Sequence, residues 1–137
     1  MSGKIFLDSN IFFYIYSNTE PAKSDICRNV LNENDCCTST QALSELSNVC
    51  IKKWNIDRNR IEKAIDEICS VCEIKLINDS TIKRGLYLNE KYKYSYYDSL
   101  MLASALENGC QKIFTEDMHG GHIIENTLTI VNIFKNG

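Results

Sequence analysis

Residues 4–16, KIFLDSNIFFYIY, place a short apolar run directly before an acidic, polar turn and a second apolar run. Residues 5–7 are β-branched, aromatic and aliphatic and predict a buried strand, whereas residues 10–16 have the spacing of a helix. Asp8 therefore stands where a predicted strand ends and a helix begins. In a sheet with helices on its faces, that position lies at the edge that lines a crevice.

The same alternation of short apolar runs and helical spacing continues along the chain. We expect strands at 5–7, 36–40, 73–77, 112–115 and 128–134, and helices at 10–16, 21–33, 41–54, 57–71, 80–91 and 96–108. This order predicts an α/β fold with a mainly parallel sheet of four or five strands, covered by helices on both faces. No linker, repeat or low-complexity tract interrupts the sequence, so residues 1–137 are expected to form one domain.

Composition narrows the classes of protein that this chain can belong to. Of 137 residues, 44% are hydrophobic and 24% are charged, which is typical of a globular chain and not of a fibre or a disordered tail. We expect a cytoplasmic protein, because no apolar run has the length of a signal peptide or a membrane span. The net charge of −3 counts against a protein that binds nucleic acid by neutralising phosphates alone.

Seven cysteines without a secretion signal indicate reduced thiols. Cys69 and Cys72 form a CxxC pair, but no second pair of suitable spacing completes a zinc site. Both lie in a stretch whose helical spacing is apolar, so we expect buried core thiols, with metal or redox chemistry as the alternative.

Four acidic residues stand where a predicted strand ends or a helix begins, and they are the candidate catalytic and metal-binding residues. Asp8 and Asp117 follow strands, Asp98 falls in the first turn of a helix, and Glu45 lies about one turn into another. The carboxyl ends of parallel strands share one edge, so these side chains are expected to converge. A cluster of negative charges is costly unless cations neutralise it, and Mg²⁺ and Mn²⁺ prefer such oxygen ligands.

Each acid also has a structural explanation. Asp8 with Asn10 is a suitable helix cap, and Ser95 with Asp98 matches a capping box. Asp117 precedes two glycines and is a reasonable turn former. Glu45 is different, because it lies among apolar residues where a solvated acid is not expected. The joint placement of the four favours a metal site.

The ordered motifs LDSN, ALSEL, YYDSLMLASAL and IFTEDM resemble those of the PIN-domain nucleases over almost the whole chain, and in particular the single-domain prokaryotic VapC-type toxins. The resemblance implies a three-layer α/β/α fold and endoribonuclease activity that depends on Mg²⁺ or Mn²⁺. It also implies a homodimer, an RNA substrate and, in toxin members, a cognate antitoxin protein that blocks the cleft.

Carried over position by position, the family's acids correspond to Asp8, Glu45, Asp98 and Asp117. Its accessory polar positions correspond to Asn10 and Thr115, which would orient the acids or bound water. Glu116 leaves the identity of the fourth acid open, although the spacing from Thr115 favours Asp117.

The segment KYKYSYYD, residues 91–98, interleaves lysines and tyrosines before Asp98. Lysines bind phosphates and tyrosines stack on unpaired bases, so Lys91, Lys93, Tyr94 and Tyr96 are candidate RNA contacts, unless the tyrosines simply pack on the core.

Two other classes of function compete with the nuclease. A non-catalytic RNA-binding module on the same scaffold would bind RNA without metal. A phosphatase of the haloacid-dehalogenase type also begins with an acid after the first strand, but it usually needs a second Asp where this chain has Asn10. The helix at 10–16 is apolar on more than one face, so part of it is a candidate interface.

Overall fold

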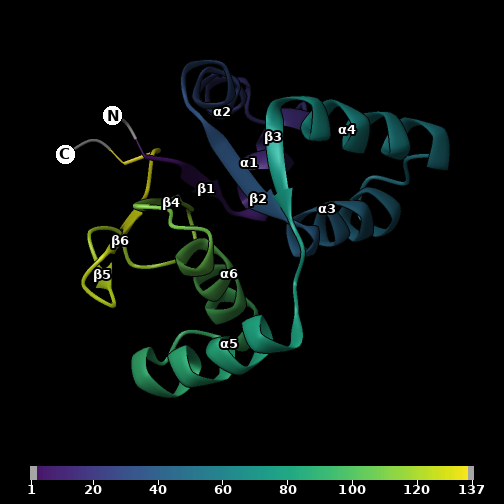
Figure 1. Ribbon diagram of the computed structural model, residues 1–137. Helices are drawn as coiled ribbons and strands as arrows, with labels where there is room; N and C mark the ends of the chain where they lie inside the picture. The colour runs from purple at the N-terminus through teal and green to yellow at the C-terminus, as the bar shows by residue number, and fades with distance from the viewer. Residues whose placement is uncertain (1–2, 136–137) are drawn as a thin grey trace.

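The computed structural model describes residues 3–135 as a twisted sheet with helices on both faces (Figure 1). The strands are β1 (Ile5–Leu7), β2 (Cys36–Ser39), β3 (Cys72–Lys75), β4 (Lys112–Phe114), β5 (Ile123–Ile124) and β6 (Leu128–Val131). The helices are α1 (Ser9–Tyr16), α2 (Pro21–Glu33), α3 (Thr40–Lys52), α4 (Arg58–Val71), α5 (Asp79–Tyr92) and α6 (Tyr96–Glu107).

The order of the strands, β3-β2-β1-β4-β6-β5, determines where the helices lie. All neighbouring strands pair in parallel except β5 and β6, which are antiparallel. The chain moves outward from β1 to β3 and then returns to β4, so right-handed crossovers place α1 to α4 on one face and α5 and α6 on the other. The strand order reverses between β1 and β4, and crevices in open α/β sheets form at that point.

The core lies on both sides of these short central strands. Phe6, Leu7, Ile113 and Ile130 are fully buried because the neighbouring strands and helices cover both faces of the sheet. Helix α6 is buried over most of its length, since it contacts β2 and β4 as well as α5. This explains why its sequence is apolar on more than one side.

Helix α1 is also a central element rather than a surface helix. Ile11, Phe12 and Ile15 are buried, and the helix packs against α2 and α3. The half-buried Phe13 and Tyr14 also pack against the core. Most of the apolar side chains of α1, which the sequence offered as a candidate interface, therefore make contacts within the domain.

The predicted α/β fold with its mainly parallel sheet is confirmed, and two details of the C-terminal part differ. The expected strand at 128–134 ends at Val131, where Asn132 Oδ1 accepts the N–H of Phe134 in a turn. The two-residue strand β5 was not predicted. It is held by pairing with β6 and by a turn with positive φ at Glu125 and Asn126, neither of which its own short sequence indicates.

The expectation that Cys69 is a core thiol was wrong. The buried face of α4 is formed by Ile61, Ala64 and Ile68, and Cys69, one position further round the helix, is exposed. Within residues 3–135 all seven cysteines are free. None of the helices in this range combines the length and the apolar character that crossing a bilayer requires.

Candidate functional site

The four predicted acids come from four different parts of the fold and lie around the carboxyl edge of the sheet, near the switch point between β1 and β4. Asp8 follows β1, and Asp117 lies in the loop after β4. Glu45 is on α3, and Asp98 is in the first turn of α6. We refer to Asp8, Glu45, Asp98 and Asp117 as the acid cluster.

Asp8 is the most deeply buried member of the cluster, with 3% of its surface exposed. It caps α1, since its Oδ1 accepts the N–H of Ser9 at 2.7 Å. Its Oδ2 accepts the hydroxyl of Thr115 at 2.7 Å. The capping role and the site position therefore coincide in one side chain.

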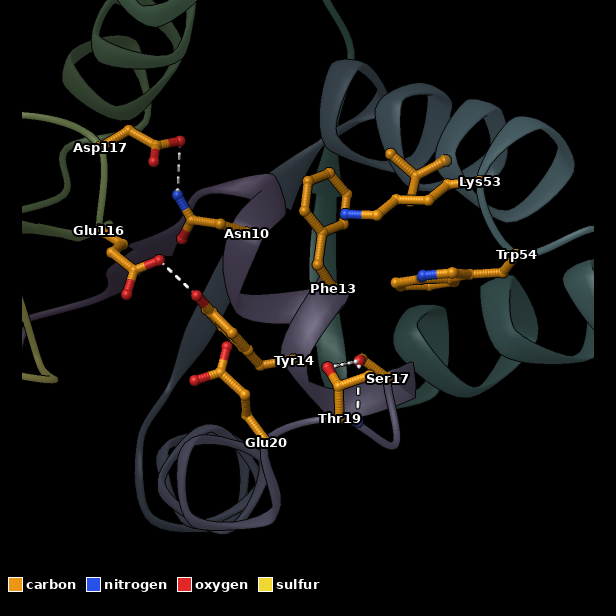
Figure 2. A pocket seen from close by; sticks show the side chains of 11 residues that line it. Asn10, Phe13, Tyr14, Ser17, Thr19, Glu20, Lys53, Trp54, Glu116 and Asp117 are labelled. Atoms are coloured by element: carbon orange, nitrogen blue, oxygen red, sulfur yellow. Dashed lines mark hydrogen bonds between the residues drawn. The ribbon is translucent and has the colours of Figure 1, made fainter.

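Thr115 links the two acids that follow neighbouring strands. Its hydroxyl oxygen accepts the N–H of Asp117 at 3.1 Å while its proton goes to Asp8. Asn10 adds a second link, because its Nδ2 donates to Asp117 Oδ2 at 3.0 Å and is 3.3 Å from Thr115 Oγ1 (Figure 2). The two accessory polar residues predicted from the sequence thus lie between Asp8 and Asp117.

Glu45 is tied to the cluster by residues that sequence reasoning missed. Ser9 Oγ donates to Glu45 Oε1 at 2.6 Å, which joins α3 to the start of α1. Gln41 Nε2 donates to Glu45 Oε2 at 3.0 Å and to the carbonyl of Tyr97 at 3.1 Å, which joins α3 to α6. Gln41 stands one helical turn before Glu45, and this spacing is the only signal that the sequence offered.

Asp98 is half-buried at the start of α6. The hydroxyl of Ser95 accepts its backbone N–H at 3.2 Å, so the predicted cap is present. Burial raises the pKa of the Asp98 carboxyl, and the negative charges of Asp117 and Glu45 raise it further. Asp98 therefore takes part in the cap of α6 and also interacts electrostatically with the other acids of the cluster.

Burial also raises the pKa of Asp8 to about 7, and the charges of Asp98 and Glu45 act in the same direction. The hydrogen bonds from Thr115 and Ser9 favour the charged form and oppose this shift. Near neutral pH and without a cation, a large fraction of Asp8 therefore holds a proton. The site is electrostatically unfavourable when all of its acids are charged.

Glu116 and its neighbour Asp117 have different surroundings. Glu116 accepts a hydrogen bond from the Tyr14 hydroxyl (Figure 2) and pairs with Lys23 Nζ at 2.6 Å. Asp117 instead bonds to Asn10 and, through its N–H, to Thr115. The geometry therefore connects Asp117, and not Glu116, with Asp8.

The donor chemistry of the cluster suits a hard divalent cation, since every member offers carboxylate oxygen. Asn10 Oδ1 is buried beside it without a hydrogen-bond partner. Across residues 3–135, however, no three acidic, histidine or cysteine side chains are gathered closely enough to form a complete metal cage. These residues fit an ion of the Mg²⁺ type, which is usually held by one or two carboxylates together with water and substrate phosphate.

The lysine and tyrosine segment is only partly free for other contacts. Lys91 pairs with Glu125 at 2.9 Å, and the Tyr94 hydroxyl lies 2.8 Å from His122 Nδ1. Lys93 is exposed at the C-cap of α5, with φ of 69°. Tyr96 is half-buried at the start of α6, where its ring packs edge-on against Tyr97.

A pocket of about 380 Å³ adjoins the acid cluster (Figure 2). We call it the aromatic pocket; it is lined by α1, the turn after α1, the end of α3 and the loop after β4, and includes Phe13, Lys53 and Trp54. Asn10 and Asp117 belong both to its lining and to the hydrogen-bond network around Asp8. Sequence reasoning did not identify it, because its residues are distant in the chain and its aromatic members Phe13 and Trp54 belong to no site motif.

The family model described as PIN domain matches residues 5–119. Comparison with curated proteins by sequence gives no match. Among solved structures, the chain is similar to one from a toxin-antitoxin complex of Klebsiella pneumoniae, with a TM-score of 0.71 and 19% identity over 96% of this chain and 99% of that one.

Two further solved structures show the same fold. VapC20 of Mycobacterium tuberculosis, a sarcin-ricin loop cleaving toxin, has a TM-score of 0.66 and 14% identity over 80% of this chain and 86% of that one. A chain of VapBC2 from Rickettsia felis, bound to a promoter DNA fragment, has a TM-score of 0.63 and 17% identity over 94% of this chain and 99% of that one. The predicted three-layer architecture is confirmed by these similarities.

Proposed function

The chain belongs to the PIN-domain family, and from this premise we propose that it is a metal-dependent endoribonuclease that hydrolyses RNA phosphodiester bonds. The observation that carries the proposal is the convergence of four acids, two of which have raised pKa values because they are buried near like charges. The repulsion between the charged carboxylates makes the acid cluster electrostatically unfavourable by itself, and a doubly charged cation bound there would offset this repulsion.

In this proposal Asp8, Glu45, Asp98 and Asp117 hold Mg²⁺ or Mn²⁺ and are the catalytic residues. When bound, the ion would lower the pKa of a water molecule and stabilise the oxygens of the phosphodiester. Asn10 and Thr115 position Asp117 and Asp8 through the hydrogen bonds described above. Ser9 and Gln41 fix Glu45 in the same way.

Cleavage of a panel of structured RNAs during Mn²⁺ titration tests the activity. We expect cleavage by the wild type and a loss of more than about 100-fold in Asp98→Asn, because even residues that only support metal ligands are commonly worth 10- to 100-fold. Asp79→Asn, at the exposed start of α5, is the matched control and should retain full activity. Cleavage in EDTA equal to that in Mn²⁺, or equal cleavage by Asp98→Asn, would refute the proposal.

The biological role that we propose is the toxin of a toxin-antitoxin pair, with a cognate antitoxin as partner. The similar chain from a toxin-antitoxin complex of Klebsiella pneumoniae and the similar toxin VapC20 of Mycobacterium tuberculosis support this role. Induced expression should arrest bacterial growth, Asp98→Asn should not, and co-expression of the neighbouring reading frame should restore growth. Arrest by both forms would contradict a role for the nuclease site.

We further propose a cytoplasmic homodimer that contacts RNA beside α6. The exposed apolar residues Leu76, Ile82 and Leu86, before and along α5, support a dimer face, and analytical ultracentrifugation tests it. Lys91, Lys93, Tyr94 and Tyr96 remain candidate RNA contacts, among which the exposed Lys93 is the most available to phosphates.

The competing RNA-binding module would bind RNA equally well in EDTA and after Glu45→Gln. The net charge of −3 does not favour it. The phosphatase alternative is opposed by the family match over residues 5–119.

A further inference from the structure

We propose that the aromatic pocket is a nucleobase subsite, in which one unpaired base of the RNA lies beside the Trp54 and Phe13 rings next to the bond that is cleaved. This inference rests on the proposed endoribonuclease function and specifies how its substrate is held. The pocket volume of about 380 Å³ lies within the usual range of roughly 300–1,000 Å³ for small-ligand sites.

Both rings pack partly against the core and also line the pocket. Phe13 and Trp54 are both half-buried and line the pocket from different elements, α1 and the turn after α3 (Figure 2). Among residues 3–135, ring pairs form between other aromatic residues, as between Tyr14 and Phe134, and neither Phe13 nor Trp54 takes part in one. A base has an aromatic face that fits such rings without requiring a particular sequence.

The turn that carries Trp54 is held by the backbone. The N–H groups of Lys53 and Trp54 donate to the carbonyl of Val49 at 2.8 and 3.2 Å. The N–H of Ile56 donates a hydrogen bond to the carbonyl of Cys50 at 2.9 Å. The indole therefore stands on a turn that backbone hydrogen bonds fix.

The location of the pocket places a base where the substrate strand must pass. Asn10 and Asp117 line the pocket and also belong to the network around Asp8. A strand whose phosphate reaches the acid cluster therefore has an adjacent nucleotide at the mouth of the pocket. Single-stranded RNA is commonly recognised by splayed bases that stack on aromatic side chains, and the pocket offers such side chains next to the acid cluster.

One cationic side chain of the pocket lining is available to a nucleotide phosphate. Lys53 extends from the end of α3 toward the pocket (Figure 2) and forms no ion pair with any residue in 3–135, so its ammonium group is free for a phosphate. Two of the acids on the lining, Glu20 and Glu116, are already paired with Lys23, at 3.7 and 2.6 Å. Lys23 offsets only one of these two carboxylates. Among the described residues, Lys53 is the one lysine on the lining itself and would be the contact for a phosphate, while Asp117 belongs to the acid cluster.

Trp54 is the only tryptophan in the chain, so intrinsic fluorescence reports directly on this pocket. The Asp98→Asn variant, which the proposed function expects to be inactive, is titrated with a short single-stranded RNA in Mn²⁺, so that binding is measured separately from cleavage. A set of otherwise identical RNAs carries one abasic nucleotide at each position in turn. We expect quenching by the intact RNA and loss of that quenching for one abasic position.

A double-mutant cycle measured by fluorescence anisotropy of labelled RNA then tests the contact itself. Trp54→Ala should weaken binding of intact RNA by between about 5-fold and 150-fold, as stacking of one base implies. Trp54→Ala should not weaken binding of the RNA whose abasic position abolishes quenching, so that the effects of the protein substitution and of the missing base are not additive. Lys53→Ala should weaken both RNAs equally, and Ile51→Ala, an exposed truncation on the same helix, should weaken neither.

Additive effects of Trp54→Ala and every abasic position would overturn the subsite. So would quenching by a basic peptide but not by RNA, which would assign the pocket to a protein partner. Both results leave the proposed function intact if the wild type still cleaves RNA with Mn²⁺. Failure of metal-dependent cleavage, with stacking present, would instead remove the activity alone, and circular dichroism confirms that each variant is folded.

Discussion

Thr115 donates its hydroxyl proton to Asp8 at 2.7 Å, across 107 positions of sequence, inside the protein. The same oxygen accepts the backbone N–H of Asp117 at 3.1 Å. One small side chain at the end of β4 therefore sets the orientation of one acid and the backbone of another. This relationship makes Thr115 the most direct test of how the acid cluster is held together.

Thr115→Val keeps the shape of the side chain but removes the donor to Asp8 and the acceptor for Asp117. We expect Mn²⁺ affinity, measured by isothermal titration calorimetry, to fall by about 10- to 100-fold, as is usual for residues that orient metal ligands. The pKa of Asp8 should rise further, because a hydrogen bond to its charged form is lost. Thr115→Ser retains the hydroxyl and should largely preserve both properties; an equal loss in both variants would point to packing instead.

The metal-free protein should become less stable as pH rises from about 4 to about 7. Burial raises the pKa of Asp8 from 3.8 to about 7, so in this range the folded state binds more protons than the unfolded state. Asp8→Asn should remove the contribution of Asp8, leaving the smaller contribution of Asp98, whose pKa is also raised, and should raise the free energy of unfolding at pH 8 by up to about 4 kcal/mol. Urea unfolding in EDTA at pH 5 and pH 8 measures the effect, and a larger gain at pH 5 would contradict it.

Asp117 and Glu116 offer a matched pair of adjacent acids. Asp117→Asn should reduce Mn²⁺-dependent cleavage by more than about 100-fold, because it removes a proposed metal ligand. Glu116→Gln should leave cleavage within a few-fold and cost about 1 kcal/mol or less, because its pair with Lys23 is partly exposed. Initial cleavage rates and thermal unfolding distinguish the two, and the reverse order of effects would assign the fourth acid to Glu116.

Gly85 sets the distance between α5 and α6. A Cβ at this position would meet the Leu100 Cα at 3.3 Å, and this backbone cannot yield as a flexible side chain can. Gly85→Ala should therefore destabilise the protein by about 1–2 kcal/mol, since overpacking outweighs the gain in helix propensity. Lys83→Ala, at an exposed position of the same helix, should be near neutral, and urea midpoints for the two variants make the comparison.

The fold was predictable because its signals are local. The β-branched and aromatic residues of 5–7 and 112–114, and the helical spacing between strands, depend only on neighbours in the chain. The acids could be located for the same reason, since each follows a strand or starts a helix. The convergence of the acids could be expected from parallel strand order, although their proposed roles await the experiments above.

The features that escaped prediction depend on distant contacts. Strand β5 exists because β6 pairs with it, and a two-residue strand carries almost no periodic signal of its own. The bond from Ser9 to Glu45 joins α1 to α3, and nothing in either motif specifies it. The aromatic pocket is similar, since Phe13 and Trp54 meet only after α1 and α3 have packed.

The position of the acids at the switch point also has a consequence during synthesis. Asp8 is made early on the ribosome, whereas Thr115 and Asp117 follow a strand that pairs directly with β1 and leave the exit tunnel late. On the proposed chemistry, a partly translated chain lacks one side of its acid cluster and cannot cut the RNA around it. Under that proposal, activity requires β4 to have paired with β1.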